Sequence, residues 1–107
     1  MLRGQVWMAT LDREVGPKYW VIVSNNGRNR NFDTALAVRV TTTNRHANLD
    51  SVVALPAGEV LNGWVACDSL TEIWDDDLAR STAEGALSRR AMSAVEDGLM
   101  AALGSRR

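Results

Sequence analysis

The sequence has one cysteine, Cys67, and one histidine, His46, among its 107 residues. A single cysteine cannot form a disulfide within the chain, and these two residues cannot supply the ligands of a Cys/His zinc site. A catalytic pair of histidines is excluded within one chain for the same reason. The sequence therefore excludes three common kinds of site before any motif is considered.

Long apolar runs are also missing. No stretch approaches the ~18 apolar residues of a membrane span, and the first residues carry no apolar stretch of signal-peptide length. The composition is 46% hydrophobic and 23% charged, and the length suits one domain with a real core. We therefore predict a single domain over residues 1–107 in a cytoplasmic protein that does not contact a membrane.

Charge is unevenly distributed along the chain. Residues 1–46 carry seven cations against three acids, whereas residues 47–107 carry five cations against ten acids. This asymmetry indicates a basic face suited to an anionic ligand such as nucleic acid. A dipolar, solvated surface is the alternative interpretation of the same counts.

Residues 16–30 contain three signals in close succession. Gly and Pro at 16–17 end a loop, the aromatic and β-branched run 19–23 favours a strand, and the Asn-Asn-Gly sequence at 25–27 ends that strand. Lys18 stands at the strand entry, and a basic, amide-rich loop is predicted at its exit. The residues of that loop are Arg28, Asn29 and Arg30.

The remaining pattern predicts a mainly β protein with a C-terminal helix. Strands are expected over residues 5–8, 20–23, 33–43, 51–55 and 64–67, with 69–73 either continuing the last strand or pairing separately. A short helical turn is expected at 75–78, and a longer helix follows Ser88 as N-cap and stops at Gly104. In the strand 33–43, alternation places Leu36, Val38 and Val40 in a core and directs Ala37, Arg39 and Thr41 away from it.

Five motifs in the same order resemble the MazF/PemK family of toxins. Residues 3–7 (RGQVW) resemble the family's opening RG(D/E)(V/I)(W/Y), and residues 18–25 (KYWVIVSN) lie where it has RPxxVxS(N/Q). Residues 34–43 (TALAVRVTTT) resemble its strand ending in ITST. Residues 65–70 (VACDSL) lie where the family has VLL(D/E)QI, and the Leu-Ser at 87–88, before the last helix, resembles the family's LS.

The resemblance implies a small SH3-like β-barrel that forms a twofold dimer. It also implies sequence-specific, metal-independent cleavage of single-stranded mRNA without a cofactor, leaving 2′,3′-cyclic phosphate and 5′-hydroxyl ends. A cognate MazE-like antitoxin would block the site.

The family's two main catalytic residues, the Arg of RP and the first Thr of ITST, correspond here to Lys18 and Thr41. Lys replaces Arg, Tyr19 replaces Pro, and Ser69 replaces the usual Gln. Lysine lacks the planar fork with which arginine contacts phosphate, but it supplies a point charge and a proton. We expect Lys18 to stabilise the phosphorane and protonate the 5′-oxygen, and Thr41 to hydrogen-bond a phosphate oxygen.

The general base is left open by the sequence, with Asp12, Glu14 and His46 as the possibilities. Trp20 is expected either to pack in the core or to stack on a base, and Cys67 to be a small core residue. The residues expected to contact RNA are Arg28, Asn29, Arg30, Arg39, Thr42, Thr43 and Trp20.

Two other functions remain compatible with the sequence. One is an RNA-binding barrel without catalysis, which the changes at Lys18 and Tyr19 permit. The other is a toxin like CcdB, which has a similar shape and binds a protein target. RNA cleavage without metal would distinguish the ribonuclease from the RNA-binding barrel. Binding to gyrase, the protein target of CcdB toxins, without RNA cleavage would indicate the CcdB-like toxin.

Overall fold

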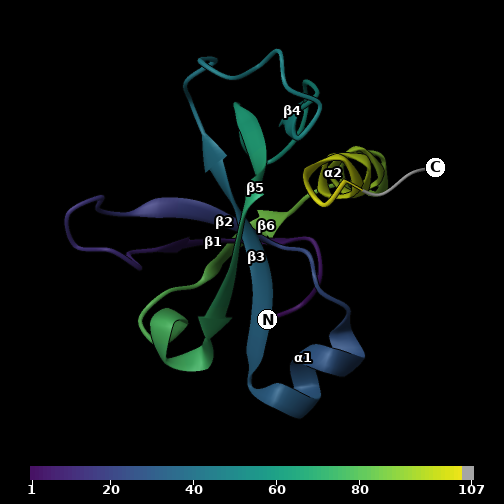
Figure 1. Cartoon of the computed structure of the whole chain (residues 1–107). Helices are drawn as coiled ribbons and strands as arrows, with labels where there is room; N and C mark the ends of the chain where they lie inside the picture. Colours follow the sequence, from purple (N-terminus) through teal and green to yellow (C-terminus); the bar gives the residue numbers. More distant parts are fainter. Residues whose placement is uncertain (105–107) are drawn as a thin grey trace.

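The computed structural model describes residues 1–104 (Figure 1). Within this range the chain forms a six-stranded antiparallel sheet in the order β4-β5-β3-β2-β1-β6. This confirms the predicted mainly β fold with a C-terminal helix. The elements are β1 (Gln5–Ala9), β2 (Lys18–Ile22), α1 (Asn26–Phe32), β3 (Thr34–Thr41), β4 (Val52–Ala54), β5 (Trp64–Trp74), a 3₁₀ turn (Asp75–Leu78), β6 (Ala83–Ala86) and α2 (Arg89–Ala102).

A bulge in the pairing of β3 with β5 bends the sheet. The pairing register shifts between Ala37 and Arg39, and β5 continues through it as one strand. Ser69 stabilises this point, because its hydroxyl accepts a hydrogen bond from the Arg39 N–H at 2.8 Å and donates one to the Ala66 carbonyl at 2.6 Å. Bulges of this kind increase the local twist and bend of a sheet. The strand order is linear, so β4 and β6 are edge strands and hydrogen bonds do not close the barrel.

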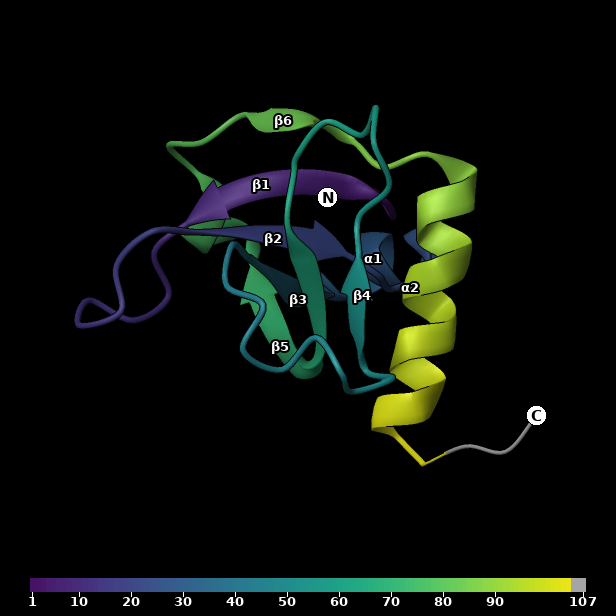
Figure 2. The same cartoon turned by 90° about the horizontal axis from the view of Figure 1, so that it is seen from above.

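The bent sheet has a core on each face. The first core lies under α2, which runs alongside β4 and β5 (Figure 2), and includes Val38 and Val40 as predicted. The second core is covered by the 3₁₀ turn and contains Trp20 and Ala37. The expectation that Ala37 points away from the core is therefore wrong. Alternation indicated which residues share a face, but it did not show that the bend buries part of the second face.

One further prediction about the elements is wrong, and one strand was missed. The basic segment at residues 28–30 lies in α1 and not in a loop, because the Asn25 side chain caps the helix by accepting a hydrogen bond from the Arg28 N–H at 2.8 Å. Strand β6 was not predicted at all. Its sequence, Ala-Glu-Gly-Ala, has no β-branched or aromatic residue, and pairing with β1 imposes its conformation.

The last helix begins as the sequence predicts. The Ser88 hydroxyl accepts a hydrogen bond from the Ala91 N–H at 3.1 Å, and the Glu59 carboxylate in turn accepts from the Ser88 N–H at 2.8 Å and the Ser88 hydroxyl at 2.7 Å. These two hydrogen bonds, the backbone one first, hold the pKa of Glu59 below its ordinary value. In the described part of the chain, no helix is long and apolar enough to cross a membrane.

The buried Cys67 thiol should be chemically silent in the native protein. Cys67 is 1% exposed, as predicted, and burial together with the Asp68 carboxylate raises its pKa to about 12. Since the thiolate is the reactive form, iodoacetamide at pH 8 is expected to leave native protein unmodified and to alkylate it fully in urea. Mass spectrometry measures this, and fast labelling of the native protein would contradict the burial.

Candidate functional site

Lys18 and Thr41 are neighbours across two paired strands. The β2–β3 register pairs Tyr19 with Val40, and one further step places Lys18 opposite Thr41. Directly opposed residues project from the same face of a sheet, and both side chains are half-buried. They line one hollow of about 330 Å³, which we call the lysine hollow. The structure thus brings together the two residues predicted to be catalytic.

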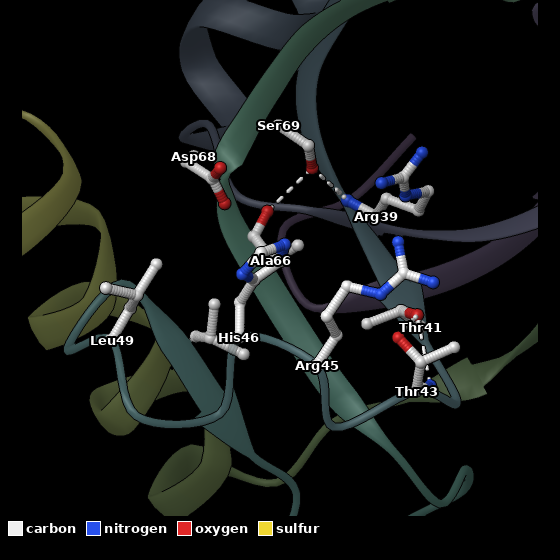
Figure 3. A pocket seen from close by; sticks show the side chains of 10 residues that line it. Arg39, Thr41, Thr43, Arg45, His46, Leu49, Ala66, Asp68 and Ser69 are labelled. Atoms are coloured by element: carbon white, nitrogen blue, oxygen red, sulfur yellow. Dashed lines mark hydrogen bonds between the residues drawn. The ribbon is translucent and has the colours of Figure 1, made fainter.

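A second hollow lies on the other side of Thr41. It has a volume of about 370 Å³, and we call it the histidine hollow (Figure 3). Three residues line both hollows and so form a ridge between them: Arg39, Thr41 and Thr43. The other polar side chains of the histidine hollow come from the loop after β3 and from β5: Arg45, His46, Asp68 and Ser69.

The Thr41 hydroxyl is held in place by the turn that follows β3. It accepts a hydrogen bond from the Thr43 N–H at 3.2 Å and lies 3.4 Å from the Thr43 hydroxyl. Because a hydroxyl both accepts and donates, the N–H contact leaves the Thr41 proton available for an anionic ligand. Thr42 lines the lysine hollow beside it.

The ridge and its two hollows have a positive character. Among the residues that the structure describes, the ion pairs are Arg3–Glu96 and Arg28–Glu72. Lys18, Arg39 and Arg45 therefore have no carboxylate within ion-pair distance in this part of the chain. Three cations and two threonine hydroxyls on one face suit a phosphate group. In the same described part, no three His, Cys, Asp or Glu side chains gather as a metal site.

Helix α1 lies at the opposite end of the sheet from the loop that follows β3 (Figure 1). Of its three predicted RNA contacts, Asn29 is 6% exposed and hydrogen-bonds Ser24 and the Met1 carbonyl. Arg28 donates to the Thr34 carbonyl at 2.7 Å and pairs with Glu72. The Arg28 side chain therefore holds the helix to β3 and β5, and the Asn29 side chain holds it to the segments that precede β1 and α1. Only Arg30 is exposed, and it lines neither hollow.

Trp20 belongs to the second core. It is 7% exposed, and its indole N–H donates to the Ala9 carbonyl at 3.4 Å. The core interpretation is therefore right, and the expectation that Trp20 contacts RNA is wrong. The bend of the sheet covers Trp20, whereas Arg39, its partner in β3, lines the histidine hollow.

Sequence reasoning missed two residues of the site and weighed a third without choosing it. Arg45 and Asp68 were not predicted, and His46 was one of several possible bases. All three line the histidine hollow. Arg45 and His46 follow the end of β3 directly, and this nearness to Thr41 along the chain is the only signal that the sequence gives for them. Asp68 is brought to the site by the β3–β5 register, which pairs Arg39 with Ala66. That register depends on the bulge and cannot be read from the sequence.

A bent antiparallel sheet with a terminal helix, and a cationic site at the end of one strand, define a small barrel-like fold with an anion-binding face. A family model described as PemK-like, MazF-like toxin of type II toxin-antitoxin system matches residues 2–103. The chain belongs to this family.

Curated relatives and solved structures agree with this assignment. The chain is 37% identical over 103 residues to Endoribonuclease MazF1 of Mycobacterium bovis and to Endoribonuclease MazF4 of Mycobacterium tuberculosis, covering 96% of this chain and 92% of each relative. It is 34% identical to a mycobacterial endoribonuclease solved in complex with its cognate antitoxin, with a TM-score of 0.88 over 100% of this chain and 98% of that one. A MazE-MazF complex from Deinococcus radiodurans, 20% identical with a TM-score of 0.77 over 99% and 97% of the two chains, shares the fold.

Proposed function

We propose that this chain is the toxin of a type II toxin–antitoxin system and a sequence-specific endoribonuclease that cleaves single-stranded mRNA. The observation that carries the proposal is the placement of Lys18 opposite Thr41, with Arg39 on the same ridge. This is where the two catalytic positions implied by the family resemblance meet. The relatives that are 37% identical over nearly the whole chain are named endoribonucleases, which supports the same activity here.

The proposed reaction needs no nucleophile from the protein. The ribose 2′-hydroxyl attacks the adjacent phosphorus, the bond to the 5′-oxygen breaks, and the products are a 2′,3′-cyclic phosphate and a 5′-hydroxyl. The protein aligns the attack and stabilises the charge that develops on the phosphorane oxygens. Lys18 and Arg39 supply positive charge for this, and Thr41 donates a hydrogen bond to a phosphate oxygen. The cations on and beside the ridge supply this charge, so the proposed reaction uses no metal or cofactor.

The proposed assembly follows the relatives. One is solved with its cognate antitoxin, and we propose that a MazE-like antitoxin covers the ridge in this protein too. We also propose a homodimer in which each chain is one toxin domain, acting in the cytoplasm, where mRNA is translated.

Thr41→Ala is expected to lower the cleavage rate of a long single-stranded RNA by about 100-fold, because it removes a charge-assisted hydrogen bond in the transition state. The assay uses purified protein in excess EDTA and maps the new ends. Cuts at a short recurrent sequence, with 5′-hydroxyl and 2′,3′-cyclic phosphate ends, are expected from the wild type. A 2′-deoxy nucleotide at the cut should abolish cleavage there.

Thr82→Ala serves as the matched control, since Thr82 is exposed and lines neither hollow. Intact RNA with the wild-type protein would overturn the ribonuclease. RNA binding without cleavage would then indicate an RNA-binding barrel, and gyrase binding would indicate a CcdB-like toxin. Equal cleavage by Thr41→Ala and wild type would overturn the role of Thr41 alone.

A further inference from the structure

His46 lies in the loop that connects β3 to β4, and its imidazole points into the histidine hollow (Figure 3). Two backbone hydrogen bonds shape this loop, from the Ala47 N–H to the Asn44 carbonyl at 3.1 Å and from the Leu49 N–H to the His46 carbonyl at 3.0 Å. Ala66 and Asp68 line the same hollow as the ring. His46 therefore lies on a turn beside the ridge.

The two hollows place His46 and Lys18 on opposite sides of the ridge. Lys18 lines only the lysine hollow and His46 only the histidine hollow, whereas Arg39, Thr41 and Thr43 line both. A phosphate bound on the ridge therefore has a cationic amine on one side and an imidazole on the other. In a displacement at phosphorus the entering and leaving oxygens lie roughly in line, on opposite sides of the phosphorus, and this arrangement offers each oxygen its own proton-transfer group.

We propose that His46 is the general base of the reaction and takes the proton of the attacking 2′-hydroxyl. This inference rests on the proposed ribonuclease function and names the residue that the sequence left open. The neutral imidazole accepts the 2′-proton as the 2′-oxygen bonds to phosphorus. The bond from phosphorus to the 5′-oxygen breaks, and the Lys18 ammonium gives that oxygen a proton. Imidazolium and amine then exchange one proton with water, which restores both groups.

The other possible bases do not share this position. Asp12 and Glu14 line neither hollow, and the Asp12 carboxylate accepts the Glu14 N–H at 2.9 Å within their own loop. Asp68 does line the histidine hollow, but a carboxylate ordinarily titrates far below neutral pH and is a weak base there. An imidazole changes charge between about pH 5 and 8. We therefore assign Asp68 a positioning role beside the imidazole.

The charged groups around His46 set the expected pH dependence. The charged groups that line the histidine hollow with His46 are Arg39, Arg45 and Asp68. A general base works only when it is deprotonated, so the wild-type kcat should fall as the pH is lowered through the titration range of an imidazole. That acidic limb of the pH–rate profile is the signature of His46.

His46→Gln is expected to lower kcat by about 100-fold at pH 7.5, within the usual range for a general base, and to leave KM within about twofold. The acidic limb between about pH 5 and 7 should disappear. A second variant, His46→Ala, should regain activity when free imidazole is added, in proportion to the neutral form of the buffer. The assay uses the full-length protein and a short RNA containing one mapped cut site.

Asn48→Ala is the matched control, because Asn48 is exposed in the same loop and lines neither hollow. It should keep the wild-type pH–rate profile. Circular dichroism should show that all variants are folded. Asp68→Asn should lower kcat and shift the acidic limb without removing it.

Different results separate the inference from the function on which it rests. Wild-type cleavage with an unchanged acidic limb in His46→Gln would overturn the inference alone. A raised KM with unchanged kcat would also overturn it, and would place a base of the RNA on His46. A wild-type protein that leaves RNA intact would overturn both proposals.

Discussion

Lys18→Ala is expected to lower kcat for RNA cleavage by about 1000-fold with a much smaller change in KM. The reason is electrostatic, since a fixed cation beside the ridge acts chiefly on charge that develops in the transition state. The variant also removes the proposed proton donor to the 5′-oxygen. Single-turnover kinetics on an RNA with one mapped cut site measure the effect.

Lys18→Arg separates charge from proton donation. Arginine restores the positive charge but does not give up a proton, so its activity should be intermediate, about tenfold below wild type. An RNA with a bridging 5′-sulfur at the cut needs no protonation of its leaving group. On that substrate Lys18→Arg should approach wild type, whereas Lys18→Ala should stay far below it.

Arg13→Ala is the control for charge, because Arg13 is an exposed cation in the loop before β2 and lines neither hollow. The sequence offers a further test, since Lys18 is its only lysine. An amine-specific acetylating reagent should inactivate the wild type and leave Lys18→Arg unaffected. Full activity in Lys18→Ala, or equal losses in both alanine variants, would contradict the assigned role.

Gly63→Ala is expected to reduce the free energy of unfolding by about 3 kcal/mol. Gly63 has φ +128°, a conformation that L-residues rarely adopt, and a Cβ there would lie 2.5 Å from the Thr41 carbonyl oxygen. Backbone strain and overpacking each cost about 1–3 kcal/mol. The clashing atom belongs to the main chain of β3, so it cannot move aside as a flexible side chain would.

Gly58→Ala provides the matched control for this change. Gly58 also has a positive φ of +92°, but nothing lies within 4 Å of a Cβ there. It should lose only the conformational cost, about 1 kcal/mol. Urea unfolding at one fixed protein concentration measures both variants. Equal losses would show that the contact with Thr41 contributes nothing, and the close approach of Gly63 to the end of β3 would then be wrong.

Most of the secondary structure could be predicted from local patterns. The run before Asn25 has the β-branched and aromatic residues of a strand, and Ser88 followed by apolar residues at helical spacing has the features of a capped helix. Helix α1 and strand β6 could not be predicted in this way. The first is a short polar helix that depends on its Asn25 cap, and the second is held by pairing with β1.

The candidate site was predictable where it depends on the order of motifs along the chain, and not where it depends on burial. Lys18 and Thr41 follow from the order of motifs along the chain, and the β2–β3 register confirms that they are neighbours. Trp20 and Asn29 were misassigned because burial is a property of the whole sheet. Both looked available in sequence, and both are covered by elements distant in the chain.

The sequence by itself determined the family, the main strands and the terminal helix, and it predicted that Lys18 and Thr41 form the catalytic pair. These depend on residue type, on spacing along one strand and on motif order, all of which are local. Only the tertiary structure decided which faces are buried and which side chains surround Thr41. The bulge held by Ser69 bends the sheet, closes a second core over Ala37, and brings Asp68 to the hollow that His46 enters. Such a bend depends on how several strands pair with one another, so no single stretch of sequence encodes it.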